Sequence, residues 1–382
     1  MVYSEDYKKL VDATALKDKY YEIDERVEEI CEVAFEGCNK LEEIVMPKKL
    51  KKIDSEAFRG CSSLTKLTLP DSVTSIGKGA FQDCRGLTEL TLPKRLKKIW
   101  NDAFMGCSGL TKLTLPDSVK SIGEHAFYGC SGLTKLTLPD SIYSIGDAAF
   151  SNCSGITELT LSKRLESIGK VVFSGCSGLT KLTLPNSVTR IDNVAFEGCS
   201  GLEKITVESG NSCYDSRDNC NSIIETETNT LIAGCKNSVI PNSVTSIGNS
   251  AFCGCSGLTE LTLPSSVTRI GNSAFEGCSG LTELTLPNSV MSIGRSAFGG
   301  CSGLTELTLP NSVTSIGGYA FAYCSGLSKI TSLAEIPPVC GYGVFDGVNK
   351  TNCELIVPKG SVAAYKQAYG WNGFSNIRGF SE

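Results

Sequence analysis

Cysteine is the residue whose type and spacing point most directly to chemistry in this chain. The sequence holds 19 cysteines and a single histidine among 382 residues. Twelve cysteines each follow a phenylalanine by three residues, from Cys38 to Cys199 and from Cys255 to Cys324. Catalytic thiols and zinc sites commonly need histidine as well, so one histidine argues against both roles. We expect these twelve to be reduced, buried thiols that pack as small hydrophobic side chains.

Four further cysteines, Cys213, Cys220, Cys235 and Cys253, lie outside this spacing. They form no C-x-x-C pair, so we expect no metal site. If a disulfide forms, the candidate pair is Cys220 and Cys235, across a predicted hairpin. The sequence contains no phosphate-binding loop, no G-x-S-x-G and no H-E-x-x-H motif. We therefore expect no catalytic residues and no cofactor.

The elements that position these residues repeat every 23 residues. One copy, from Leu64 to Cys84, reads LTKLTLPDSVTSIGKGAFQDC. The alternation in LTKLTL predicts a short half-buried strand that Pro70 ends. A second short extended piece follows, and Ala80-Phe81 is expected on a tight helical turn. Each copy has too few apolar residues for a core of its own, so stacked copies must share one.

The pattern LxxLxLPxxVxxIGxxAFxxCxxL resembles the BspA-like class of bacterial leucine-rich repeats, over roughly residues 20–382. The resemblance implies an α/β leucine-rich-repeat solenoid, a right-handed coil with a parallel β-sheet on one face and short strands and helical turns on the other. The repeats predict about 13–14 turns. The resemblance also implies a cell-surface or secreted protein that adheres to host, matrix or neighbouring-cell proteins.

The repeat pattern divides the chain into five segments. The step from Phe196 to Phe252 is 56 residues, where two repeats would give 46, and Ser222–Thr226 and Thr230–Ala233 within it are predicted strands of a hairpin. This insert is expected to form a longer coil that keeps the register, with a protruding recognition loop as the alternative. The segments are an N-terminal helical cap (1–19), repeats (20–200), an irregular repeat with the hairpin insert (201–240), further repeats (241–332) and a C-terminal cap (333–382).

The outward strand positions are the candidate binding residues. Neighbouring strands lie about 4.8 Å apart, so equivalent residues of successive copies align in columns. One column mixes lysine and glutamate before the insert and stacks three glutamates after it, and the next column is threonine. Stacked like charges are unfavourable, so the acidic stripe could receive a basic partner or a cation, with a solvated face as the alternative. The candidate residues are Glu260, Glu283, Glu306, Lys66, Lys112, Lys135, Thr262, Thr285 and Thr308.

A basic edge is the other charged feature. It is formed by Lys48, Lys49, Lys51 and Lys52 in one copy and by Lys94, Arg95, Lys97 and Lys98 two copies later. This edge could meet an acidic partner, a glycan sulfate or a membrane surface, and the alternative is a charged edge that keeps the protein soluble.

Charge and hydropathy narrow the functional class. The net charge of −5 argues against nucleic acid as a partner. No stretch approaches the roughly 18–20 apolar residues of a transmembrane helix, and the N-terminal residues lack the apolar core of a signal peptide. We expect a non-enzymatic, protein-binding solenoid, monomeric in preference to oligomeric, at the cell surface or secreted. A cytoplasmic interaction scaffold is the alternative.

Overall fold

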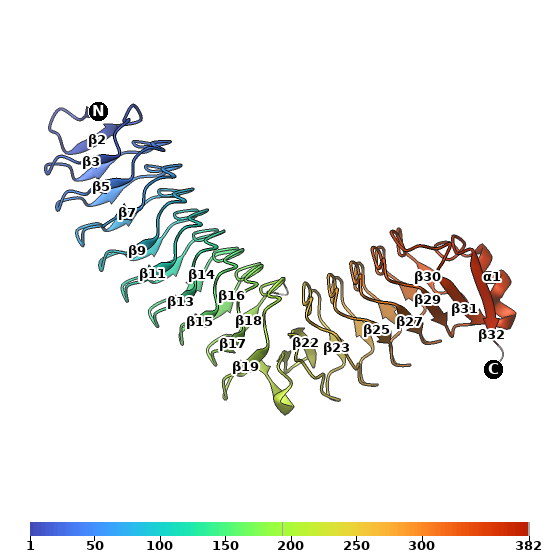
Figure 1. The fold of residues 1–382 in the computed structure, drawn as a ribbon. Coiled ribbons are helices and arrows are strands. Elements are labelled where there is room, and N and C mark those ends of the chain that lie inside the picture. Colours follow the sequence, from blue (N-terminus) through green and yellow to red (C-terminus); the bar gives the residue numbers. More distant parts are fainter. Residues whose placement is uncertain (193, 381–382) are drawn as a thin grey trace. The chain divides into compact units, whose positions relative to one another are not determined.

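Two compact units, Met1–Phe196 and Glu197–Glu382, make up the computed structural model of this chain. The structure describes residues 1–192 and 194–380. Each unit is a β-solenoid of stacked coils (Figure 1). A typical coil gives one strand to a first row, where Leu-x-Leu segments pair, and one to a second row, where x-Ile segments pair. The Ala-Phe turns form the third side of each coil.

The first unit contains both rows. Its first-row strands are β3 (Tyr20–Glu22), β5 (Glu43–Val45), β7 (Lys66–Leu67), β9 (Glu89–Thr91), β11 (Lys112–Thr114), β13 (Lys135–Thr137), β15 (Glu158–Thr160) and β17 (Lys181–Leu184). Its second-row strands are β2 (Lys9–Asp12), β4 (Glu29–Ile30), β6 (Lys52–Ile53), β8 (Ser75–Ile76), β10 (Lys98–Ile99), β12 (Ser121–Ile122), β14 (Ser144–Ile145), β16 (Ser167–Ile168) and β18 (Arg190–Ile191). β1 (Val2–Tyr3) pairs antiparallel with β2.

The second unit repeats this plan. Its first-row strands are β19 (Lys204–Val207), β25 (Glu283–Thr285), β27 (Glu306–Leu309), β29 (Lys329–Ser332), β31 (Glu354–Pro358) and β32 (Asn376–Phe380). Its second-row strands are β22 (Thr230–Ala233), β23 (Ser246–Ile247), β24 (Arg269–Ile270), β26 (Ser292–Ile293), β28 (Ser315–Ile316) and β30 (Val339–Cys340), preceded by β20 (Tyr214–Asp215) and β21 (Ile223–Glu225). The helical segments are η1 (Arg217–Asn219), η2 (Lys359–Ser361) and α1 (Val362–Gln367).

Burial follows the repeat pattern. Leu67 and Ile76 point inward from the two rows, while Lys66 and Thr68 face solvent. The phenylalanines of successive coils stack face to face, with ring centroids 4.8 Å apart for Phe35 and Phe58. Each unit therefore has a continuous core that no single coil could bury alone.

The prediction of helical turns on the Ala-Phe side is wrong, because only about 3% of the chain is helical. The backbone N–H groups there alternate between two kinds of partner. Phe58 N–H donates to the Ala80 carbonyl of the next coil at 2.8 Å, whereas Arg59 N–H donates to Glu56 within its own turn at 3.0 Å. Glu56 also adopts a left-handed φ of 55°. Since a helix needs every N–H for its own ladder, this side forms turns and the fold is a β-solenoid.

The N-terminal helical cap expected over residues 1–19 is also wrong. The segment contains β1 and β2, and β2 pairs in parallel with β4, with Leu10 opposite Ile30. β4 would otherwise be an open sheet edge, and β2 satisfies its backbone groups where a helix could not.

The structure has about 16 coils rather than 13–14, because both end segments continue the rows. At the C-terminal end the segment predicted as a cap contains β31 and α1. Tyr365 and Trp371 are fully buried there. In the insert, β21 and β22 are antiparallel, as expected of the hairpin, and β22 also pairs in parallel with β23.

Candidate functional site

The first-row strands place the predicted lysine, glutamate and threonine positions in register. Lys112 lies opposite Glu89, Lys135 opposite Glu158 and Glu283 opposite Glu306. Their side chains point to solvent because the intervening leucine points into the core. The structure therefore aligns these residues in columns within each unit.

The three candidate lysines of the first unit all have acidic neighbours. Their Nζ atoms lie 3.3 Å from a Glu43 oxygen (Lys66), 3.8 Å from Glu89 (Lys112) and 2.9 Å from Glu158 (Lys135). Exposed pairs of this kind add about 0–1 kcal/mol of stability. They do neutralise the column, so the first unit presents mixed charge on this face.

The second unit presents a different face. Glu306 pairs with Lys329 at 3.1 Å, but Glu260 and Glu283 have no ion pair within residues 1–192 and 194–380. Glu283 also lies beside Glu306 in the sheet register. Negative charge is therefore concentrated at Glu260 and Glu283, on a surface that also carries exposed Thr262 and Thr285.

A hollow of about 510 Å³ lies between these two coils. Its rim includes Glu260, Glu283, Thr262, Thr282 and Thr285. Glu306 and Thr308 lie one coil further along and do not line it. The structure thus brings four of the predicted residues around one hollow. We call this set, Glu260, Glu283, Thr262 and Thr285, the acidic face.

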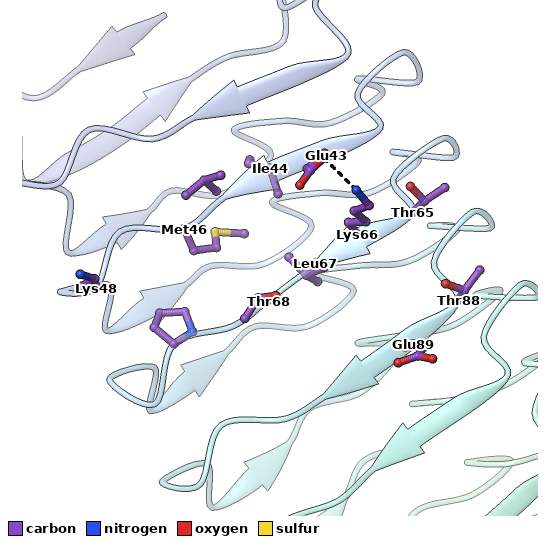
Figure 2. Close-up of a pocket in the computed structure, with 12 residues that line it drawn as sticks. Glu43, Ile44, Met46, Lys48, Thr65, Lys66, Leu67, Thr68, Thr88 and Glu89 are labelled. Carbon is purple, nitrogen blue, oxygen red and sulfur yellow. Dashed lines mark hydrogen bonds and ion pairs between the residues drawn. The ribbon is translucent and has the colours of Figure 1, made fainter.

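A second hollow on the first row is shown in Figure 2. It measures about 590 Å³ and lies over β5, β7 and β9. Lys66 bonds to Glu43 on one side, and Glu89 lies on the next coil. Thr65, which spacing did not single out, also lines this hollow. The positive and negative side chains around this hollow offset one another. We therefore expect it to select a charged partner less strongly than the acidic face does.

The repeated cysteines are buried thiols, as expected. Cys84 is fully buried, and its Sγ–H donates to the Phe58 carbonyl of the preceding coil at 3.2 Å. The same bond recurs from Cys61 to Cys176 and from Cys278 to Cys324. Burial raises the pKa of the Cys61 thiol to about 12. These groups remain protonated at neutral pH, so they are donors and not nucleophiles.

The off-phase cysteines surround the hairpin insert. Cys220 and Cys235 are both buried free thiols. The Ser238 hydroxyl lies 3.7 Å from the Cys235 sulfur and 3.0 Å from the Ser222 hydroxyl, which in turn donates to the Cys220 carbonyl. The disulfide between Cys220 and Cys235 remains a prediction.

Metal binding needs several ligating side chains close together, and the structure describes residues 1–192 and 194–380. No three His, Cys, Asp or Glu side chains there gather in a way that could hold a metal ion. The single histidine, His125, is about half exposed, and its Nδ1 lies 3.6 Å from Asp102. Within the same residues no helix is long and apolar enough to cross a membrane.

The parallel rows, the stacked phenylalanines and the leucine spacing define a leucine-rich-repeat solenoid. The sequence matches the family described as "BspA type Leucine rich repeat region (6 copies)" over residues 15–134, 97–223 and 222–350. The chain belongs to this family. No curated protein matches it in the sequence comparison.

Solved structures of bacterial leucine-rich repeat proteins share the fold. A leucine-rich repeat protein from Bacteroides ovatus is 28% identical, with a TM-score of 0.62, over 95% of this chain and 84% of that one. The pneumococcal vaccine antigen PcpA is 24% identical, with a TM-score of 0.56, over 83% of this chain and 87% of that one. At this identity the PcpA match supports the fold alone. Leucine-rich-repeat solenoids of this class typically bind other proteins.

Proposed function

We propose that the chain is a non-enzymatic adhesion module, at the cell surface or secreted, that binds a protein partner through the acidic face of its second unit. The observation that carries this proposal is the pair of uncompensated glutamates, Glu260 and Glu283, around one hollow. A partner with basic side chains would relieve the like-charge contact between Glu283 and Glu306.

The acidic face suits a protein more than a small molecule. The hollow is open to solvent. Threonine hydroxyls and carboxylates form its rim, and leucine side chains lie beneath. The next coil presents Glu306 and Thr308 in register with Glu283 and Thr285, so contacts can extend onto that coil. Such surfaces give specificity and fast association through charge complementarity. Membership of the BspA-type family supports an address outside the cell.

An intracellular scaffold is the second candidate, and the cysteines favour it. Within the described residues, no cysteine is joined in a disulfide. Disulfides are typical of oxidising compartments and rare in the cytosol, so a chain this rich in reduced cysteine fits a reducing compartment. Burial offers the other explanation, because thiols inside the core are protected from oxidants wherever the protein resides.

Protease shaving of intact producing cells separates the two addresses. Release of repeat peptides from intact cells is expected, with a cytosolic marker enzyme retained as the control. If the chain is fully protected under conditions that shave a known surface protein, the result supports the intracellular scaffold and contradicts the adhesion module.

Binding is tested separately on the purified chain. Individually immobilised matrix and cell-surface proteins, basic and acidic, are scanned by biolayer interferometry at low and high salt. Saturable binding to a basic protein that weakens with salt is expected, because exposed charges are screened within a Debye length of about 10 Å. Binding that is indifferent to salt, or restricted to acidic proteins, would contradict the acidic face as the binding site.

A further inference from the structure

Trp100 occupies a position that glycine holds in the neighbouring coils. The residue after the second-row isoleucine is Gly77 in the preceding coil and Gly123 and Gly146 in the next two. A Cβ atom built on Gly77 would lie 2.5 Å from the Ser55 backbone nitrogen, well inside the 3.0 Å limit for real contacts. Asp54 and Asp192 hold the equivalent position in other coils and keep the ladder bond, since their N–H groups donate to Ile30 and Ile168 at 2.9 and 3.0 Å. Trp100 places a large aromatic side chain at this position.

The ladder is open where Trp100 stands. Gly77 N–H donates to Ile53 and Gly123 N–H to Ile99, each at 2.8 Å. No such bond joins Trp100 to Ile76 in the part of the chain that the structure describes, and β8 and β10 belong to different sheets. β14 and β16 also lack ladder bonds, yet they remain close, whereas β8 and β10 lie farther apart. Trp100 therefore lies beside two unpaired strand edges.

A hollow of about 540 Å³ lies at this opening. Trp100 and Lys98 form part of its wall, together with Lys78, Ser75, Asp54 and Asn101. Trp100 is 44% exposed, and Lys98 Nζ lies 3.9 Å from the ring centroid. An exposed indole beside polar groups is a surface that a ligand ring can cover.

The hollow carries uncompensated positive charge. Lys52 pairs with Asp54 at 2.8 Å, and Lys78 lies 3.7 Å from Asp102. Lys98 and its neighbour Lys97 have no ion pair among residues 1–192 and 194–380. A ligand that enters this hollow therefore gains by bringing negative charge to Lys98.

We propose that the Trp100 hollow binds a saccharide that bears carboxylate or sulfate groups. The C–H face of a sugar ring would pack on the indole, and its anionic group would draw Lys98 Nζ away from the ring. Sugar hydroxyls both donate and accept hydrogen bonds, so they match the mixed set of Ser75, Asp54 and Asn101. Open strand edges on β8 and β10 add backbone donors and acceptors of the same kind. The volume suits a short oligosaccharide, since small-ligand pockets measure about 300–1,000 Å³.

Intrinsic fluorescence reads this site directly. The chain has two tryptophans, and Trp371 is fully buried, so a ligand that packs on an indole acts on Trp100. The purified chain is titrated with a heparin tetrasaccharide, a hyaluronan tetrasaccharide and neutral maltotetraose. A saturable blue shift is expected with a charged saccharide, and the comparison of heparin with hyaluronan distinguishes sulfate from carboxylate. Equal binding of maltotetraose, or no binding of either charged saccharide, would overturn the proposal.

Three variants, measured by calorimetry with the saccharide that binds best, locate the site. Trp100→Gly restores the residue that the repeat uses, so the variant is expected to fold and to lose at least about tenfold in affinity. Lys98→Gln should weaken binding by several fold. Lys49→Gln removes the same charge from the basic edge outside the hollow and should leave affinity unchanged. If Lys49→Gln weakens binding as much as Lys98→Gln, or if a glutamate oligopeptide binds equally well, the site is a diffuse basic surface and the proposal fails.

Discussion

The Cys84 thiol donates its hydrogen bond to the Phe58 carbonyl oxygen of the preceding coil, across 3.2 Å. The same oxygen accepts the backbone N–H of Cys61 at 3.2 Å. Phe58 in turn stacks on Phe81, with ring centroids 5.1 Å apart. One residue type thus ties the turn of one coil to the core of the next, which explains the regular cysteine spacing without any chemistry at sulfur.

Native thiol labelling checks this role for the cysteines. Cys31, Cys213 and Cys253 are partly exposed, whereas the repeated cysteines are buried. We expect a thiol reagent to modify those three first and the repeated cysteines only slowly, with all twelve repeated cysteines reactive in denaturant. Mass spectrometry after short labelling identifies the sites. Rapid native labelling of Cys84 or Cys107 would contradict their burial.

Alkaline pH should destabilise the protein through the same thiols. Burial raises the pKa of Cys61 and of Cys107 to about 12, from the ordinary thiol value of 9.0. Both stay protonated in the folded state while the unfolded chain ionises, so the stability is present below about pH 9 and is lost as pH rises towards 12. Each thiol should lower the free energy of unfolding by about 1.4 kcal/mol per pH unit in that window.

Urea unfolding at a series of pH values measures this loss. Cys107→Ala removes one such thiol and should make the fall above pH 9 shallower by one thiol's share. Tyrosine and lysine also titrate in this range, but both proteins share that background. Identical slopes for the two proteins would show that Cys107 does not contribute.

Charge reversal at Glu283 should leave the fold intact. Glu283 lies opposite Glu306 in the sheet, so Glu283→Lys converts a like-charge pair into an opposite-charge pair. The expected change is a stabilisation of about 0.2–1 kcal/mol, measured by chemical unfolding. High salt should shrink the gain. A loss of stability beyond the error of the measurement would mean that this column is not packed as described.

The close approach at the repeat glycine is tested by Gly146→Ala. A Cβ there would lie 2.5 Å from the Glu124 backbone nitrogen, so the two coils must separate. We expect a cost of about 1–3 kcal/mol in the free energy of unfolding. Gly360→Ala is a matched control, because a Cβ at Gly360 meets nothing within 4 Å. Equal effects of the two substitutions would show that the coils at Gly146 tolerate a Cβ atom.

Sequence periodicity predicted the core and the columns, because apolar spacing determines which residues must be buried together. Leu67, Ile76 and Phe81 are buried as their spacing indicates. The turns on the phenylalanine side were not predictable from residue type. The left-handed position before Ala-Phe is occupied by residues as different as Glu56, His125 and Ser250, so the inter-coil hydrogen bonds set the conformation there.

Identical segments can also differ in structure. LTELTLP occurs at residues 258–264 and again at 281–287, but only the second copy contains a strand, β25. Since the letters are the same, the difference arises from the neighbouring coils, and the hollow between the two copies has no local sequence signal. The helix predicted for the N-terminal segment is wrong for a related reason. The spacing of Tyr7, Leu10 and Val11 fits a helix face, but β4 offers an unpaired edge that favours a strand.

The most direct test of the account compares two charge reversals in binding to the basic protein identified by interferometry. Glu283→Lys alters the acidic face, and Glu227→Lys makes the same change in the exposed turn of the hairpin insert. The account predicts that Glu283→Lys weakens binding by about tenfold or more while Glu227→Lys leaves it unchanged. Unchanged affinity with Glu283→Lys, or a loss confined to Glu227→Lys, would contradict the acidic face and make the insert the recognition element.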